Sequence, residues 1–161
     1  MKDDERVLAD VRATLVRYLR QKGMRRTPER FAILDKIFAT DGHFYADSLW
    51  EVLEADGYHV SLSTVYSTLK LMIDAGLLRR HQFGDQPAQF ERVLPDSPSS
   101  HYHLVCSLCG RVREVKDNDT LSQIGQRRYP TFQPSYCVVY VYGLCSRCLK
   151  RQRRQERQRQ K

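Results

Sequence analysis

The sequence predicts an α+β protein in two parts: four helices and a β-hairpin come first, and a smaller α/β part with four paired cysteines follows. Three observations support this fold class. Apolar residues recur at helical spacing through residues 7–73. Two short apolar segments flank a Gly84-Asp85 turn, the pattern of a β-hairpin. Beyond the hairpin, strand-like segments alternate with two C-x-x-C motifs.

The first two helices have recognisable boundaries. The first carries its apolar stripe over residues 7–19 and is expected to end at Gly23. The second is expected to begin with Thr27 as N-cap and Pro28 at its first position. Its predicted buried stripe consists of Phe31, Leu34, Ile37 and Phe38.

The next two helices precede the hairpin. The third is expected over residues 46–55 and ends before Gly57, with a buried stripe of Leu49, Val52 and Leu53. The fourth is capped by Ser61 or Ser63 and ends at Gly76. Its predicted buried residues are Val65, Leu69, Met72 and Ile73. Short helices followed by a hairpin are the order of a winged helix-turn-helix.

Composition divides the chain into four segments. Residues 1–93 form the predicted winged helix-turn-helix, and residues 94–100, rich in proline and serine, form a linker. Residues 101–149 form the second domain, and residues 150–161 a basic tail. Within the second domain we expect strands at 101–107, 112–116 and 137–142 and a short helix at 120–128.

The positive charge is concentrated at the C-terminus. The chain of 161 residues has a formal net charge of +8. The tail contains seven Lys or Arg and one Glu, so that it holds most of this excess. It is either a solvated, partly helical extension or an arm that binds phosphates and is released by salt.

Membrane insertion and secretion are not expected. No apolar run reaches the ~18–20 residues of a membrane span. The charged N-terminus MKDDERVLAD lacks the apolar middle of a signal peptide. We therefore expect a cytoplasmic protein.

Five cysteines suggest a metal rather than a disulfide framework, because cytosolic thiols stay reduced. Four of them form the pairs Cys106-x-x-Cys109 and Cys145-x-x-Cys148. Two such pairs supply four thiolates for a closed tetrahedral Zn²⁺ site. The alternatives are four thiols buried in a core, or one redox-active cysteine pair. The redox pair is disfavoured because neither motif lies in a thioredoxin-like βαβ segment. The fifth, Cys137, is a small core hydrophobe, or else a redox-sensitive thiol or soft ligand, for instance of heme.

The histidines suggest a second metal site. His101 and His103 are two residues apart, so that on a strand both lie on one face. Two such imidazoles can bind Zn²⁺ or a transition metal, although two ordinary surface histidines give the same pattern. His59 and His81 are expected to be surface or wing residues.

The motifs along the chain resemble, in order and in spacing, those of the ferric uptake regulator family. The matching residues are Thr27-Pro28-x-Arg30-x-x-Ile33-Leu34, His43, Ser63-Thr64-Val65-Tyr66, Gly76-Leu77, Phe90-Glu91, His101-x-His103-Leu104-x-Cys106-x-x-Cys109-Gly110 and Tyr142-Gly143-x-Cys145-x-x-Cys148. The resemblance implies a homodimer in which the winged helix binds a double-stranded DNA operator and the C-terminal domain dimerises.

The resemblance also implies a regulatory metal site between the two domains. Its expected ligands are His43, Glu91, His101 and His103. Ligands without thiolate suit Fe²⁺, with Zn²⁺ and Mn²⁺ as alternatives. The family's peroxide sensors typically have aspartate at the position of Glu91, so this residue favours iron or zinc.

A further metal site found in many family members is expected to be absent. The corresponding positions here are Ser100, Tyr102, Leu121 and Cys137. Serine and leucine do not replace the ligands of that site.

The helix that begins near Ser61 is the expected DNA reader. The expected DNA contacts are Arg25, Thr64, Tyr66, Ser67 and Lys70. The family usually has arginine where this chain has Ser67, and a bidentate contact of arginine with guanine contributes about 1–3 kcal/mol of discrimination. The operator is therefore expected to differ from the usual one, or to be bound more weakly.

The sequence therefore predicts a metal-dependent, homodimeric DNA-binding repressor of metal homeostasis, with iron as the expected signal. It is not expected to be an enzyme, to use a small-molecule substrate or to bind a membrane. A heme- or metal-sensing protein with altered or weak operator binding is the alternative. A zinc hydrolase would need an open zinc position beside a general base, which the motifs do not provide.

Overall fold

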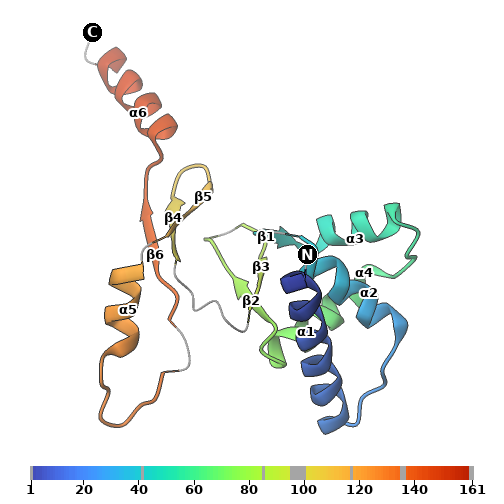
Figure 1. Cartoon of the computed structure of the whole chain (residues 1–161). Helices are drawn as coiled ribbons and strands as arrows, with labels where there is room; N and C mark the ends of the chain where they lie inside the picture. The colour runs from blue at the N-terminus through green and yellow to red at the C-terminus, as the bar shows by residue number, and fades with distance from the viewer. Residues whose placement is uncertain are drawn as a thin grey trace. The chain divides into compact units, whose positions relative to one another are not determined.

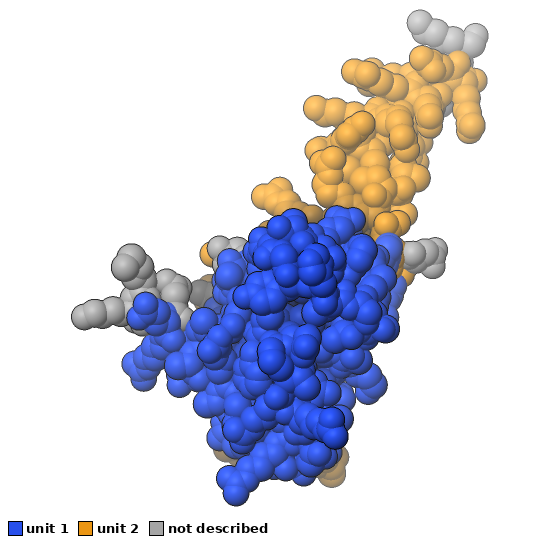
Figure 2. All heavy atoms as spheres, turned by 90° about the vertical axis from the view of Figure 1, so that its right-hand side faces the viewer, with its two compact units in different colours: residues 1–82, 87–96 blue, residues 83–86, 97–161 orange. Residues whose placement is uncertain are grey.

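The computed structural model describes residues 2–40, 42–84, 86–94, 101–116, 118–134 and 137–159. The chain divides into two compact units (Figures 1 and 2). Unit 1 comprises Met1–Gln82 and Pro87–Asp96, and unit 2 comprises Phe83–Gln86 and Ser97–Lys161. The predicted linker lies, from residue 95 onward, outside the described residues.

Unit 1 contains four helices and a three-stranded sheet (Figure 1). The helices are α1 (Lys2–Gln21), α2 (Pro28–Phe38), α3 (Ala46–Ala55) and α4 (Leu62–Asp74). The strands are β1 (His43–Tyr45), β2 (Leu78–His81) and β3 (Gln89–Arg92). The prediction of four helices followed by a hairpin is confirmed.

Local chemistry explains most of the helix boundaries. Ser61 is the N-cap of α4, and its hydroxyl accepts a hydrogen bond of 3.1 Å from the Thr64 N–H. Gly76 follows the end of α4 with a φ of +73°, which glycine adopts without strain. Thr27 precedes α2 as predicted, but its side chain makes no capping hydrogen bond. Instead, the backbone N–H of Glu29 and the Thr27 hydroxyl lower the pKa of the Glu29 carboxyl.

The helices of unit 1 enclose an apolar core. Its main buried residues are Val11, Leu15, Leu19, Ile33, Leu34, Ile37, Leu49, Leu53, Val65, Leu69, Met72, Leu77, Leu78 and Phe90. Phe31, Phe38 and Ile73 are only partly buried and pack against its edge. The prediction that Val52 is buried was wrong, because its side chain is 42% exposed.

The sheet of unit 1 has one strand more than the predicted hairpin. The strand order is β1-β3-β2, and both neighbours of β3 run antiparallel to it. In this register His43 lies directly opposite Glu91. The predicted hairpin, β2 with β3, is therefore only part of the sheet. β1, which directly precedes α3, is its third strand.

Unit 2 is built on a second sheet of three strands, in the order β5-β4-β6. Its elements are β4 (His101–Cys106), β5 (Val112–Lys116), α5 (Asn118–Gln126), β6 (Tyr140–Gly143) and α6 (Ser146–Arg159). β5 is antiparallel to β4 and β6 is parallel to it. The strand predicted for residues 137–142 begins later, at Tyr140, although the Val139 carbonyl still accepts a hydrogen bond from His103.

The four residues Phe83–Gln86 belong to unit 2, although they lie between strands of unit 1 in the sequence. The Phe83 ring is 1% exposed and lies 5.4 Å from the His103 ring and 5.5 Å from the Tyr140 ring. A Cβ at Gly110 would lie 3.0 Å from the Gln86 side chain, so that this turn leaves little room for a larger residue. In the part of the chain that is described, no helix is both long and apolar enough for a membrane span.

Candidate functional site

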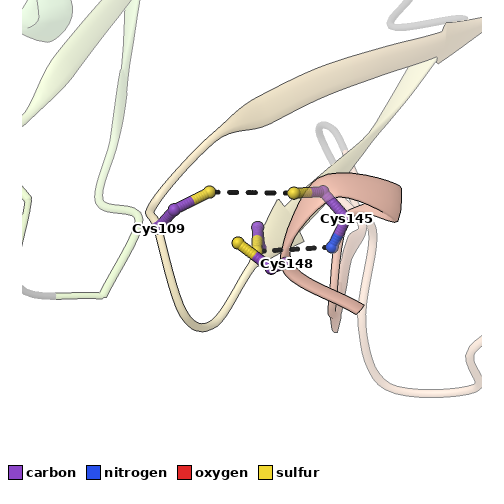
Figure 3. A group of neighbouring side chains, drawn as sticks. Cys109, Cys145 and Cys148 are labelled. Carbon is purple, nitrogen blue, oxygen red and sulfur yellow. Dashed lines mark hydrogen bonds between the residues drawn. The ribbon is translucent and has the colours of Figure 1, made fainter. Parts of the chain in front are cut away.

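Four cysteines from two distant segments meet in unit 2. Cys106 is the last residue of β4, and Cys109 follows it in a turn that closes with a hydrogen bond of 2.9 Å from Gly110 N–H to the Cys106 carbonyl. Cys145 directly precedes α6, and Cys148 lies in its first turn (Figure 3). The parallel pairing of β4 with β6 brings the two segments together, since Cys106 pairs with Gly143.

The spacing of the sulfur atoms fits a tetrahedral zinc ion. The four Sγ atoms all lie within 4.8 Å of one another, and the Cys109 and Cys145 sulfurs are 3.8 Å apart. Four sulfurs at about 2.3 Å from Zn²⁺ in a tetrahedron lie about 3.8 Å from one another. The Cys145 N–H also donates to the Cys106 sulfur over 3.3 Å, which stabilises a thiolate. The cluster is therefore compatible with a structural zinc site.

The surroundings of these thiols differ. Hydrogen bonds from backbone N–H groups, of which that of Cys145 has the largest effect, lower the pKa of Cys106 to about 6. The N–H of Cys148 likewise lowers the pKa of Cys145. Burial, followed by the neighbouring thiols, raises the pKa of Cys148 to about 12. Zinc binding must therefore expel a proton from Cys148, which makes the affinity fall as the pH falls.

The sheet of unit 1 gathers two histidines and a glutamate. Directly opposed residues of antiparallel strands share one face, which places His43 beside Glu91. His81 on β2 pairs with Gln89, two residues before Glu91, and therefore reaches the same face on the diagonal. His81 was predicted to be a surface or wing residue: it does lie in the predicted hairpin, at the end of β2, but it is 1% exposed and therefore not a surface residue.

The distances in this cluster suit a metal with nitrogen and oxygen ligands. His81 Nε2 is 2.8 Å and His43 Nε2 is 3.9 Å from Glu91 Oε2. The ligand atoms of the three residues all lie within 4.8 Å of one another. Neighbouring ligands that lie about 2.1 Å from one metal ion are separated by about 3–3.5 Å. Only small side-chain shifts separate this arrangement from a coordination shell.

The other two predicted ligands lie in unit 2. His101 and His103 are on β4, and their rings are 4.9 Å apart. His103 is 1% exposed, and the Phe83 and Tyr140 rings flank it. Each unit thus has its own part of the predicted ligand set, His43 and Glu91 in unit 1 and His101 and His103 in unit 2.

Helix α4 presents one polar face to solvent. Ser63, Tyr66, Ser67 and Lys70 are spaced as one face of a helix requires, and all are exposed. Val65, Leu69 and Met72 occupy the opposite, buried face. Tyr66 is 48% exposed at the centre of the polar face. The helix therefore has the form of a recognition helix, with an anchored apolar side and an accessible polar side.

The remaining predicted DNA contacts differ in how accessible they are. Arg25 is exposed, and its carbonyl accepts a hydrogen bond from the Arg30 guanidinium. The Thr64 hydroxyl is 2.8 Å from the Ser61 hydroxyl and thus belongs to the helix cap. The Ser67 hydroxyl donates back to the Thr64 carbonyl over 3.0 Å, and the Lys70 ammonium lies 3.4 Å from the Asp74 carboxylate.

Comparisons with known proteins agree on one family. The model of the ferric uptake regulator family matches residues 21–142. The chain belongs to this family. The members of the family are metal-responsive transcriptional regulators rather than enzymes.

The similar proteins include regulators named for peroxide and a regulator named for ferric uptake. The peroxide-responsive repressor PerR of Staphylococcus saprophyticus is 31% identical over 132 residues, 81% of this chain and 86% of that protein. The peroxide operon regulator of Bacillus subtilis is 30% identical over 136 residues, 83% of this chain and 90% of that protein. The ferric uptake regulator of Pseudomonas aeruginosa, solved with manganese, has a TM-score of 0.62 and 32% identity over 78% of this chain and 94% of that chain.

Membership of the ferric uptake regulator family confirms the resemblance and the predicted fold class. The residue that sequence reasoning missed is His81. The predicted turn did not reveal it, because a two-residue turn at Gly84-Asp85 would pair residue 81 with residue 88, whereas the observed register pairs His81 with Gln89. That register places His81 diagonal to Glu91 and on its face.

Proposed function

We propose that this family member is a metal-dependent, homodimeric repressor that binds an operator in double-stranded DNA and controls metal homeostasis in the cytoplasm. The observation that carries the proposal is the set of His43, His81 and Glu91, in which His81 is buried and the other two side chains are partly buried. These side chains lie on the sheet of the unit that also contains helix α4. A metal bound there acts on the same compact body that carries the DNA-reading face.

The regulatory metal would be held by His43 and Glu91 of unit 1 and by His101 and His103 of unit 2. His81 binds the Glu91 carboxylate over 2.8 Å and either orients it or joins the ligand set. A metal that takes ligands from both units favours one arrangement of the two units over all others. That difference in affinity is what shifts a population of conformations toward DNA binding.

We propose Fe²⁺ as the signal, with Zn²⁺ and Mn²⁺ as the alternatives that the same ligands allow. The relatives in Staphylococcus and Bacillus are named for their response to peroxide, which makes peroxide the competing signal. Glu91, in place of the aspartate typical of the family's peroxide sensors, favours the metal.

The edge of the second sheet supports a homodimer. β6 is an edge strand in the order β5-β4-β6, so that one row of its backbone groups faces away from β4. Three apolar side chains at this edge are exposed, Val141 by 46%, Tyr142 by 54% and Leu144 by 40%. A second copy of the chain would cover such an edge, which supports unit 2 as the dimerisation domain.

The function is tested by metal-dependent selection of DNA. Purified dimer with its zinc content determined is incubated with sheared genomic DNA, with and without added Fe²⁺, Mn²⁺ or Zn²⁺, and the bound fragments are sequenced. We expect one tightly held zinc per chain and enrichment of specific sites by one metal. One zinc per chain without metal-dependent enrichment of specific sites would favour the alternative, a heme or metal sensor with weak operator binding. Loss of the enriched sites on adding peroxide, rather than on removing metal, would identify a peroxide regulator.

Tyr66→Ala is expected to weaken binding to the selected sites by roughly 5- to 150-fold, the effect of losing one base contact of about 1–3 kcal/mol. Tyr58→Ala is the matched control, because Tyr58 is 53% exposed but lies outside α4. Both variants should melt as the unmodified protein does. Fluorescence anisotropy with a labelled site gives the two dissociation constants. Equal effects of the two substitutions would rule out Tyr66 as a specific contact.

His81→Gln is expected to lower the affinity of the regulatory site for Mn²⁺ or Co²⁺ by roughly 10- to 100-fold, the usual cost of losing a group that holds a ligand. His59→Gln is the control, because His59 makes the same kind of pair with Glu54, over 3.0 Å, on the protein surface. Competition titrations of the zinc-containing dimer measure both affinities. Unchanged affinity in His81→Gln would show that the pair with Glu91 is unrelated to metal binding.

A further inference from the structure

The C-terminal helix α6 continues far beyond the zinc ligands. Its fourteen residues, Ser146–Arg159, contain seven Arg or Lys and one acid, Glu156. From residue 150 the chain has no apolar residue, and residues 151–159 are all exposed. Packing against an apolar core therefore cannot account for this part of the helix. Its chemistry is that of a positively charged surface.

The positive charges of α6 lie mostly on one side. Arg147, Lys150, Arg151 and Arg154 are spaced i, i+3, i+4 and i+7, which aligns them on one face. Arg153 and Arg157 widen this face along the flank of Lys150. Glu156 lies on the opposite side. Among the described residues, no ion pair involves an α6 side chain.

A hollow of about 810 Å³ extends the basic face at the start of the helix. Its lining residues are Cys109, Arg111, Ser146, Arg147, Cys148, Lys150, Arg151 and Arg154. It therefore combines five cations with two of the zinc ligands and contains no carboxylate. The four-cysteine cluster holds the first turn of α6 beside Arg111. The charged side chains of the later turns are exposed to solvent.

We propose that the basic face of α6 is a second DNA-binding surface, which binds the phosphates of double-stranded DNA without reading its sequence. The inference rests on the proposed function in that the operator is duplex DNA. Arginine forks pair with phosphate oxygens, and arginine supplies five of the six cations of α6 from residue 150 onward.

The chemistry of the helix favours duplex DNA over other polyanions. Single-stranded nucleic acids are bound largely by aromatic residues that stack on unpaired bases, and residues 150–161 contain none. An interfacial membrane helix needs an apolar face, which is also missing. The phosphates of a duplex require only charge on a rigid, extended element, and a helix of fourteen residues is about 21 Å long.

The test uses the full-length zinc-containing dimer and a labelled duplex of about 30 base pairs with an arbitrary sequence, without added metal. In one variant Arg151, Arg153, Arg154 and Arg157 are all replaced by glutamine, which keeps helix propensity and every cysteine. In the control the same four residues are replaced by lysine, which keeps the charge. Zinc content and dimer mass are checked for each protein. Dissociation constants are measured over a range of salt concentrations.

We expect the glutamine variant to bind the arbitrary duplex roughly 10- to 100-fold more weakly at about 0.1 M salt, with a salt slope lower by about 3–4, because each phosphate contact contributes about 0.9 to the slope. The lysine variant should keep most of the affinity and the slope. An unchanged slope in the glutamine variant, or an equal loss in the lysine variant, would overturn the proposal. So would tighter binding of a single-stranded RNA or an anionic vesicle than of the duplex.

This result is independent of operator selection. Binding to the arbitrary duplex requires neither a specific site nor the regulatory metal. The salt slope can therefore confirm the role of α6 even where no operator is found. Conversely, metal-dependent enrichment of specific sites by a dimer with the glutamine substitutions would support the proposed function while the slope measurement decides on α6.

Discussion

Replacing Cys148 by serine is expected to release the structural zinc and to unfold unit 2. Cys148 is 4% exposed and connects α6 to the end of β4 through the sulfur cluster. Zinc binding contributes roughly 10–16 kcal/mol in small zinc-binding peptides, whereas a whole domain is stable by about 5–15 kcal/mol. The small sheet of unit 2 is not expected to remain folded without it.

Elemental analysis and calorimetry of the Cys148→Ser protein check this expectation. We expect zinc to fall from one atom per chain toward none, and the transition of unit 2 to disappear while that of unit 1 remains. Cys137→Ser is the matched control, because Cys137 is the fifth cysteine and lies outside the cluster. A Cys148→Ser protein that keeps one zinc per chain and both transitions would contradict the structural role of the site.

Replacing Glu91 by glutamine is expected to abolish the metal response of DNA binding. Glu91 lies within 2.8 Å of His81 and 3.9 Å of His43, and it is the carboxylate of this cluster. A neutral amide is a much weaker ligand for a divalent cation, and the loss of a direct ligand should cost at least about 100-fold in affinity, more than the loss of a group that only orients one. The structural zinc should be unaffected.

The measurement compares metal affinity and DNA affinity in the same protein. In Glu91→Gln the DNA affinity without added metal should match that of the unmodified protein, and added metal should no longer increase it. Glu54→Gln removes the carboxylate from the corresponding surface pair with His59 and should leave both quantities unchanged. A full metal response in Glu91→Gln would show that the regulatory metal binds elsewhere.

Local signals in the sequence were sufficient for the helices and for the cysteine cluster. Capping and terminating residues such as Ser61 and Gly76 act within one or two turns of the chain, so that their effect can be predicted without tertiary contacts. The C-x-x-C spacing is equally local and fixes two sulfurs on one turn. That the two pairs meet followed from the number of ligands zinc requires.

The features that could not be predicted from the sequence depend on contacts between distant segments. Strand β1 has only three residues, too few for a period-2 pattern, and it exists because β3 pairs with it. The burial of His81 depends on the register of the wing, and its position two residues before Phe83 gave no sign of it. Val52 follows the helical period of Leu49 and Leu53 but lies at the edge of the apolar stripe, where spacing alone does not decide burial.

The most direct test of the central claim is the affinity of the dimer for the regulatory metal, measured with and without its selected DNA site while the structural zinc stays bound. If metal promotes DNA binding, linkage requires that DNA raise the metal affinity by the same factor, which is about 5- to 150-fold for typical coupled sites. We predict that these two factors agree and that both vanish in Glu91→Gln. An equal metal affinity in the presence and absence of DNA would contradict the account, because a metal without preference for the DNA-bound state cannot regulate it.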